Sequence, residues 1–247
     1  MSHFSRLALC LGPQGLQRLM RSWILVCGLG AVGSMAVEAL VRSGIGRLTL
    51  IDFDRFDSTN INRQILALDS TVGHSKVSVT AGRVREIAPD CMVEPLEIFL
   101  DAASVPLVLE RPADVIIDAI DTVASKTELL LRLQASGRAV VSSMGAALRM
   151  DPTRVRVDDL SSTRVCPLAR TIRRTLASHG VTTGIRCVFS EEPPIKSTRL
   201  PPHESNGLLD APGPRPLGSF MPVTAAFGLA AAAEAIRLIL DTEPDRP

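Results

Sequence analysis

The sequence has five cysteines but no Cys-x-x-Cys pair. Structural zinc ribbons rely on such pairs, and disulfide frameworks of small secreted proteins use an even number of cysteines. The sequence therefore argues against both a zinc ribbon and a disulfide scaffold. Free thiols are typical of a reducing compartment, so we predict a cytoplasmic protein.

A strong charge of either sign is also missing, because 27 Lys and Arg face 26 Asp and Glu and the formal net charge is +1. Nucleic acids attract proteins mainly through cations that face phosphates. A balanced chain has no such general attraction, so any RNA contact requires a local basic patch.

Long apolar runs are absent except between Leu217 and Ala233. The amino terminus lacks the charged segment and apolar core of a secretory signal. A membrane span usually needs about 20 apolar residues, whereas this run is rich in Ala, contains Pro222 and stops at Glu234. We predict a buried helix and disfavour a membrane contact, with peripheral association as the alternative.

What the chain does contain is a glycine turn between a strand and a helix, since residues 24–33 read ILVCGLGAVG. Gly28 lets the chain turn sharply, Gly30 lacks the Cβ that would block a phosphate, and Gly33 lets helix and strand pack closely. The helix then presents its free N–H groups to an anion. Asp52 ends the next strand, where a carboxylate accepts hydrogen bonds from ribose hydroxyls. This pattern fits NAD and ATP equally well.

The residues after Asp52 favour ATP. Residues 60–64 read NINRQ, and Lys76 begins an amphipathic stretch. A nicotinamide enzyme has no need for Arg63 and Lys76, because the glycine turn already binds its pyrophosphate. Cleavage of a triphosphate needs fixed cations against the charge that develops on the phosphates. A lysine at a helix start opposes the helix dipole, which favours function over the alternative of a solvated surface charge.

At these residues the sequence resembles the adenylating enzymes related to ubiquitin-activating enzyme, which include the bacterial activators of sulfur-carrier proteins. The resemblance implies ATP and Mg²⁺ as cofactors. It implies nucleotide binding by Gly28, Gly30, Ala31, Gly33, Asp52, Asp54, Asn60, Asn62, Arg63, Gln64, Lys76, Asp121 and Thr122. It implies catalytic roles for Arg63, Lys76, Asp121 and Arg6. Ala31 stands where the family often has another glycine.

Two of these residues have competing interpretations. Asp118 and Asp121 both follow a predicted strand, and either can cap a helix; in the family the residue matching Asp121 lies near the phosphates and Mg²⁺, so we favour Asp121 as the metal ligand. Arg6 falls where a family arginine reaches into the nucleotide site of the partner subunit. This implies a homodimer, and a solvated charge is the alternative.

Within the family, the sequence resembles the branch that acts on threonylcarbamoyladenosine in tRNA. Shared features include Gly44-Ile45-Gly46, the Asn62-Arg63-Gln64 motif, Asp151-Pro152-Thr153 and the stretch 187–191, which reads CVFSE. The resemblance implies ATP-dependent cyclisation, by dehydration, of that nucleoside through an acyl adenylate. Sulfur-carrier activators usually have Cys-x-x-Cys pairs and a reactive cysteine, which are missing here.

Three other functions stay open. The chain can instead adenylate the C-terminal glycine of a ubiquitin-like or sulfur-carrier protein, with a sulfur-transfer protein as its partner. It can be an NAD-dependent oxidoreductase, or a nucleotide-binding module without turnover. No cysteine has an obvious base beside it, so we assign no nucleophile: Cys187 is expected to be buried and inert, and Cys166 to be more accessible. Some relatives carry a cysteine shortly before the last helix, where this sequence has Leu217 to Pro222.

The alternation of strands and helices predicts an α/β fold with a Rossmann-like, doubly wound and mostly parallel sheet, followed by an antiparallel C-terminal extension. Strands are expected at 24–27, 48–51, 93–98, 115–119, 139–142 and 186–191, and helices at 5–22, 76–87, 102–109, 124–136, 164–178 and 222–241. We predict one adenylating domain over 1–247, with an N-terminal helix (1–22), a nucleotide-binding core (23–157), a basic helix with a Pro-rich loop (158–219) and a C-terminal helix (220–241).

Two further predictions concern the second half of the chain. Residues 147–150 and 155–157 alternate around a Pro-containing turn, which predicts an antiparallel hairpin. The basic helix carries a candidate tRNA patch, and a solvated helix face is the alternative reading. This patch consists of Arg164, Arg170, Arg173, Arg174 and Arg199.

Overall fold

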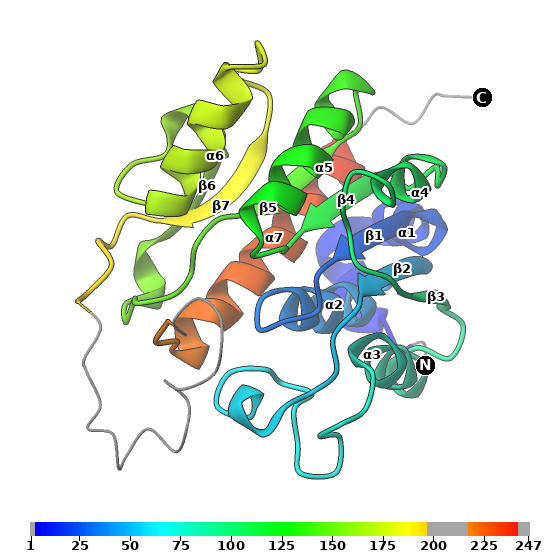
Figure 1. Ribbon diagram of the computed structural model, residues 1–247. Coiled ribbons are helices and arrows are strands. Elements are labelled where there is room, and N and C mark those ends of the chain that lie inside the picture. The colour runs from blue at the N-terminus through cyan, green and yellow to red at the C-terminus, as the bar shows by residue number, and fades with distance from the viewer. Residues whose placement is uncertain (1–2, 197–216, 242–247) are drawn as a thin grey trace.

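The computed structural model describes residues 3–196 and 217–241. Its described strands form one sheet in the order β3-β2-β1-β4-β5-β7-β6, parallel throughout except for the β6–β7 pair (Figure 1). The strands are β1 Trp23–Cys27, β2 Arg47–Asp52, β3 Met92–Glu97, β4 Val115–Asp118, β5 Val140–Ser143, β6 Val155–Asp159 and β7 Arg186–Ser190. The predicted fold class is confirmed.

Helices cover both faces of this sheet. The α-helices are α1 Ser5–Arg21, α2 Gly33–Arg42, α3 Lys76–Ile87, α4 Val105–Leu109, α5 Val123–Ala135, α6 Pro167–Ala177 and α7 Met221–Asp241. Successive residues of a strand point to opposite faces, so Val26 of β1 packs with α2, α3 and α7 whereas Leu25 packs with α4, α5 and α6. Strands covered on both faces are largely apolar: β1 is apolar throughout, and β4 is apolar up to its last residue, Asp118.

The strand order determines at which edge of the sheet a ligand can bind. The chain moves from β1 to β2 and β3 on one side and to β4 and β5 on the other. Ligands of such sheets bind outside the carboxyl ends of the strands, at the point where the order reverses. Gly28, Asp52 and Asp118 lie at the carboxyl ends of β1, β2 and β4, so they share this edge as predicted.

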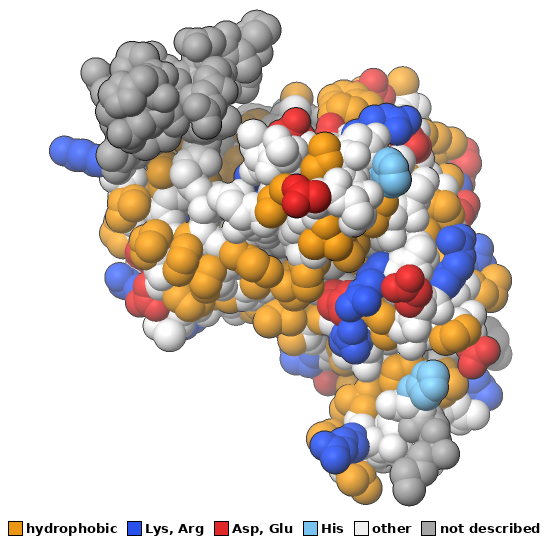
Figure 2. Space-filling view, turned by 90° about the horizontal axis from the view of Figure 1, so that it is seen from below, with side chains coloured by type: hydrophobic (Ala, Val, Ile, Leu, Met, Phe, Trp, Pro, Cys, Tyr) orange, Lys and Arg blue, Asp and Glu red, His pale blue; other side chains and the backbone are white. Residues whose placement is uncertain are grey.

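Helix α7 is the apolar run noted in the sequence. By length and composition alone it could cross a membrane, yet half of its most apolar window is buried in the protein. It packs closely on α2, because a Cβ added to Gly228 would lie 2.4 Å from the Val32 carbonyl oxygen. The predicted buried helix is confirmed. Hydrophobic side chains also gather in a band on one face of the molecule (Figure 2), and Leu229 of α7 remains 50% exposed.

The predicted hairpin is wrong. Residues 147–150 form no strand, and β6 instead pairs antiparallel with β7, which follows some thirty residues later along the chain and lies between β5 and β6. The local alternation was correct for β6 but did not reveal its partner, because that partner comes from a distant segment.

Three helices differ from the prediction, one by an internal kink and two in their first residue. Helix α1 is kinked, since Gly12 has φ 71° and Pro13 follows it. Helix α6 begins at Pro167, because Val165 has φ 52° and proline favours the first helical position. Helix α4 begins at Val105, three residues later than predicted.

Candidate nucleotide-binding site

The glycine turn is held between two neighbouring strands. The Gly28 N–H donates to the Ile51 carbonyl over 2.8 Å. Gly28 has φ 88°, and a Cβ there would lie 2.8 Å from the Ala119 carbonyl oxygen. A Cβ on Gly33 would lie 1.8 Å from the Gly28 carbonyl oxygen, so neither position accepts a side chain. A Cβ on Gly30 would instead approach nothing closer than Gln64 Nε2, at 3.9 Å, which leaves room for a phosphate.

Asp52 ties the glycine turn to the end of β2. Its Oδ2 accepts from the Leu29 N–H over 2.5 Å, and its Oδ1 accepts from the Asp54 N–H over 2.8 Å. The residue is 8% exposed. Each carboxylate oxygen accepts more than one hydrogen bond, so ribose hydroxyls can still be bound while the backbone stays fixed.

Lys76 is not a surface charge. The residue is 5% exposed, and its Nζ lies 2.8 Å from Asp54 Oδ2. Its N–H also donates to the Asp54 carbonyl over 3.0 Å, so the first residue of α3 is fixed to the loop after β2. An ammonium has three donors, and those not used by Asp54 remain for a phosphate.

The segment between β2 and α3 brings the NINRQ residues to the same edge. Asn60 is 9% exposed and closes a capping box with Asp57, whose pKa is lowered by its hydrogen bonds from Thr59. Arg63 is half-buried, and its Nη1 donates to the Thr59 carbonyl over 2.7 Å and to Asn62 Oδ1 over 2.9 Å.

Gln64 has a buried side-chain amide with one unpaired atom. The residue is 6% exposed, and its Oε1 has no hydrogen-bond partner among the residues that the structure describes. Buried polar atoms are nearly always paired, and Gln64 Nε2 is the atom that faces Gly30. The unpaired oxygen can accept a hydrogen bond from a donor group of a ligand, such as a nucleotide hydroxyl or amino group, whereas Nε2 is the donor beside Gly30.

The two acids after β4 have different roles. Asp118 is fully buried, and its Oδ2 lies 2.6 Å from Lys126 Nζ and 2.6 Å from Ser142 Oγ. Asp121 is exposed, and its nearest recorded partner is Thr122 Oγ1 at 3.4 Å. Asp118 therefore faces the interior, and Asp121 is the acid that remains available to a metal ion.

The buried network around Asp118 was missed by sequence reasoning. Lys126 has no exposed surface, and its Nζ also approaches the Asp118 carbonyl at 3.5 Å and Ser142 Oγ at 3.3 Å. Asp118 Oδ1 accepts from the Ile120 N–H over 3.1 Å, so the pair fixes the turn that carries Asp121. The one available signal was that Lys126 lies on the apolar side of its helix, three residues before Leu129.

The remaining predicted residues lie at the rim or away from it. Ala31 is half-buried in the glycine turn, whereas Asn62 and Thr122 are exposed. Arg6 is exposed on α1, and among the described residues no hydrogen bond or ion pair joins it to the glycine turn. Its predicted role needs a second copy of the chain and stays a prediction.

Residues 3–196 and 217–241 contain no group of three His, Cys, Asp or Glu side chains that could hold a metal ion. This does not conflict with Mg²⁺, which is usually bound through one or two carboxylates together with substrate phosphates.

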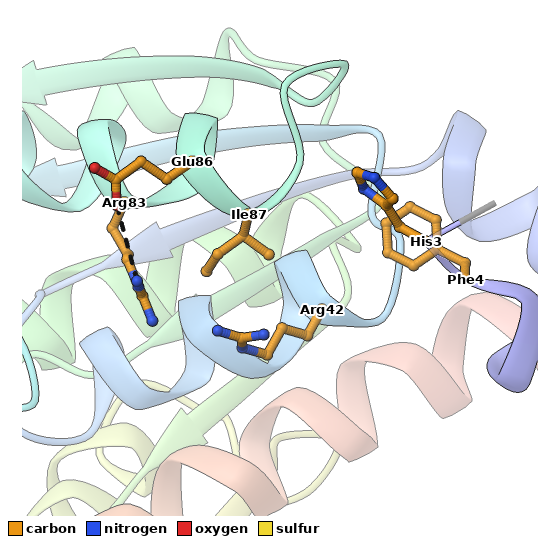
Figure 3. Close-up of a pocket in the computed structure, with 6 residues that line it drawn as sticks. All are labelled: His3, Phe4, Arg42, Arg83, Glu86 and Ile87. Atoms are coloured by element: carbon orange, nitrogen blue, oxygen red, sulfur yellow. Dashed lines mark ion pairs between the residues drawn. The ribbon is translucent and has the colours of Figure 1, made fainter. Parts of the chain in front are cut away.

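A cavity of about 510 Å³ lies away from this site, near the carboxyl ends of α2 and α3 (Figure 3). It is lined by His3, Phe4, Arg42, Arg83, Glu86 and Ile87. Its arginines are paired, because both Arg42 and Arg83 bind Glu38 and lower the pKa of that carboxyl despite its burial. This cavity is not the predicted nucleotide site.

The buried thiols are poorly placed to act as nucleophiles. Cys187 is fully buried, and burial raises its pKa to about 12. The prediction that Cys166 is accessible is wrong, since it is 3% exposed under the first turn of α6. Cys27 lies beside the buried network, and burial raises its pKa as well.

The candidate tRNA patch is only partly at the surface. Arg164, Arg170 and Arg174 are exposed. Arg173 is half-buried and donates to the carbonyl and hydroxyl oxygens of Thr163, at 3.0 and 2.5 Å, which makes it a structural residue. Arg199 lies outside the described residues.

Comparison with known proteins decides the family. The family model described as the ThiF family matches residues 4–247, nearly the whole chain. The chain belongs to the ThiF family. Among its ThiF-family relatives, tRNA threonylcarbamoyladenosine dehydratase of Bacillus subtilis is 42% identical over 192 residues, which is 78% of this chain and 76% of that protein.

Solved structures agree with this assignment. The fold is similar to that of Escherichia coli tRNA N6-threonylcarbamoyladenosine dehydratase in complex with AMP, with 36% identity, a TM-score of 0.86 and coverage of 96% of this chain and 93% of that one. The ATP complex of the E. coli protein matches with a TM-score of 0.85 and 35% identity over the same shares of both chains. The chain is also similar to molybdopterin-synthase adenylyltransferase of E. coli, which is 35% identical over 137 residues, 56% of this chain and 54% of that protein.

Proposed function

We propose that this protein uses ATP to cyclise threonylcarbamoyladenosine in tRNA, with net loss of water from the nucleoside. One observation carries the proposal: similarity to a dehydratase of this substrate extends over nearly the whole of both chains, and the structure of that relative holds ATP. The glycine turn, Gln64 and the buried Lys76 provide a site for such a nucleotide.

The reaction follows from the charges around the glycine turn. The threonyl carboxylate attacks the α-phosphorus of ATP, an acyl adenylate forms and pyrophosphate leaves. Arg63 and Lys76 offset the negative charge that develops on the leaving group. The neighbouring carbamoyl group then closes the ring on the activated carbonyl and expels AMP. Because both reacting groups belong to one nucleoside, proximity drives this step, and no protein nucleophile is required.

Asp121 would hold Mg²⁺, which would supply further positive charge at the phosphates. The exposed carboxylate at the rim of the site supports this role. Asn60 orients the triphosphate, and Asp52 binds the ribose. We further propose that the protein is a cytoplasmic homodimer in which Arg6 of one copy reaches the site of the other. The exposed position of Arg6 on α1 and the apolar band of Figure 2 are consistent with a partner subunit.

The test is to incubate the purified protein with ATP, Mg²⁺ and tRNA that carries threonylcarbamoyladenosine. The expected result is AMP, pyrophosphate and a nucleoside lighter by one water on mass analysis. ATP binding without AMP formation would instead indicate a module without turnover.

A second candidate substrate is the C-terminal glycine of a sulfur-carrier protein, because part of the chain is also similar to the sulfur carrier protein adenylyltransferase of Thermus thermophilus, at 34% identity over 110 residues. Pyrophosphate exchange separates the two: modified tRNA stimulates it in the first case, and a carrier protein does so in the second.

A further inference from the structure

Among residues 3–196 and 217–241, the buried Arg149 forms no ion pair with an acidic side chain. The residue is 2% exposed and belongs to the loop that follows β5. Its Nε donates to the Glu192 carbonyl over 3.1 Å and its Nη1 to the Ala147 carbonyl over 3.0 Å. Within the described part of the chain, its Nη2 has no hydrogen-bond partner. The Glu192 carboxylate instead accepts the N–H groups of Met150 and Asp151.

An arrangement of this kind is unfavourable in the absence of an anion. A buried charge costs several kcal/mol unless an opposite charge or enough hydrogen bonds compensate for it. Backbone carbonyls supply partial compensation, but one guanidinium nitrogen remains unpaired, and arginine is the residue best suited to bind phosphate or carboxylate oxygens. The site therefore fits an oxyanion that belongs to a ligand.

A second feature at the same place also favours an anion. Helix α6 begins at Pro167, and the side chain of the preceding residue, Cys166, makes no capping hydrogen bond. The first N–H groups of a helix have no partner within the helix and carry partial positive charge. A Cβ on Gly145 would lie 3.7 Å from Cys166 Sγ, 3.5 Å from Leu168 Cβ and 3.9 Å from Arg149 Nη1, so the guanidinium adjoins the start of the helix.

The position of this pair relative to the glycine turn restricts the ligand. Arg149 lies in the loop after β5, and β4 stands between β5 and the strand that leads into the glycine turn. A carboxylate that attacks the α-phosphorus must lie at the glycine turn, so we assign a different anion to Arg149. The other anion of a modified nucleotide is its backbone phosphate.

We propose that Arg149 and the amino terminus of α6 bind a backbone phosphate of the substrate RNA. This inference rests on the proposed function, because it takes RNA as the substrate. The exposed Arg164 and Arg170 flank the first turn of α6 and extend the positive surface around the site. The bound phosphate fixes the nucleotide so that its carboxylate reaches the nucleotide-binding edge.

The test compares two substrates of the full-length protein. One is an RNA stem-loop that carries threonylcarbamoyladenosine, and the other is the same modified nucleoside without phosphates. Arg149→Gln is expected to raise KM for the stem-loop about 10- to 100-fold, the range for loss of hydrogen bonds to a charged group, and to leave KM for the free nucleoside and for ATP unchanged. Arg154→Gln, an exposed arginine nearby, is the matched control.

Equal effects of Arg149→Gln on both substrates would overturn the proposal, as would no effect on either. If Arg149→Gln does not fold, Arg149→Lys keeps the charge with fewer donors and should show a smaller rise in KM for the stem-loop only. If the wild-type protein modifies neither substrate, the proposed function fails. The phosphate site is then judged by binding of an unmodified stem-loop in the presence of AMP, which Arg149→Gln should weaken and Arg154→Gln should not.

Discussion

The ammonium of Lys76 lies 2.8 Å from the carboxylate of Asp54, and the two side chains differ in exposure, at 6% and 46% respectively. The ammonium of Lys76 is therefore buried, whereas the carboxylate of Asp54 is accessible to solvent. An incoming phosphate meets Asp54 at the surface and must share or replace it as the partner of Lys76.

We expect Lys76→Met to lower kcat/KM for ATP at least about 100-fold, because a fixed cation against the leaving pyrophosphate is lost. The measurement is AMP formation with modified tRNA. Lys196→Met removes an exposed lysine and should behave as wild type. An active Lys76→Met protein would show that the buried ammonium only stabilises the fold.

The pair formed by Asp118 and Lys126 gives a prediction on stability. Removal of one partner of a buried ion pair usually costs about 3–5 kcal/mol. Lys126→Met should therefore lower the free energy of unfolding by that amount, as measured by urea denaturation. The double variant with Asp118→Asn should cost less than the sum of the single changes, because no unpaired charge is left. Arg132→Met breaks an exposed ion pair of the same helix and should cost less than about 0.5 kcal/mol.

The exposed arginines of α6 give a prediction on salt dependence. If Arg170 and Arg174 contact phosphates, changing both to Glu should weaken tRNA binding and reduce the slope of log K against log salt by about 1–2. Arg21→Glu with Arg85→Glu, on other helices, supplies a control of equal charge. An unchanged affinity for tRNA would remove these two arginines from the interface.

Thiol reactivity tests the absence of a nucleophile. The thiolate is the reactive form and exists only above the thiol pKa, which burial raises to about 12 for Cys187 and to about 11 for Cys91. At pH 8 the native protein should therefore react with iodoacetamide at the exposed Cys10 only, and raising the pH to 9 should add no second site. Denatured protein should react at all five cysteines. Rapid labelling of Cys166 in the native state would contradict its observed burial.

The sequence predicted best those features that depend only on residues close together in the chain. The strand, glycine turn and helix around Gly28 are local, so their geometry follows from neighbouring residues. The partner of β6 could not be predicted, because β7 comes from a distant part of the chain. The buried Lys126 was missed for a related reason: its partner Asp118 precedes it by eight residues, and only the packing of α5 on the sheet shows that the two meet.

The same reasoning explains which of the predicted site residues lie together in the structure. Asp52, Asp54, Gln64 and Lys76 lie near one edge because that edge is fixed by the strand order. Arg6 is not joined to them within the described part of one chain, and no pattern within a single sequence can show a second copy. Helical spacing predicts Arg173 to be a surface charge, but its hydrogen bonds to Thr163 give it a structural role.

Leu148 has a consequence for how this chain can vary. Its φ is 58°, its N–H donates to the Gly218 carbonyl and its carbonyl accepts from the Ile195 N–H. Residues 195 and 218 are therefore both held by the backbone of this one residue. Glycine adopts a positive φ readily, whereas proline fixes φ at about −65° and has no N–H. Leu148→Gly should therefore keep both anchors, and Leu148→Pro should loosen both at once.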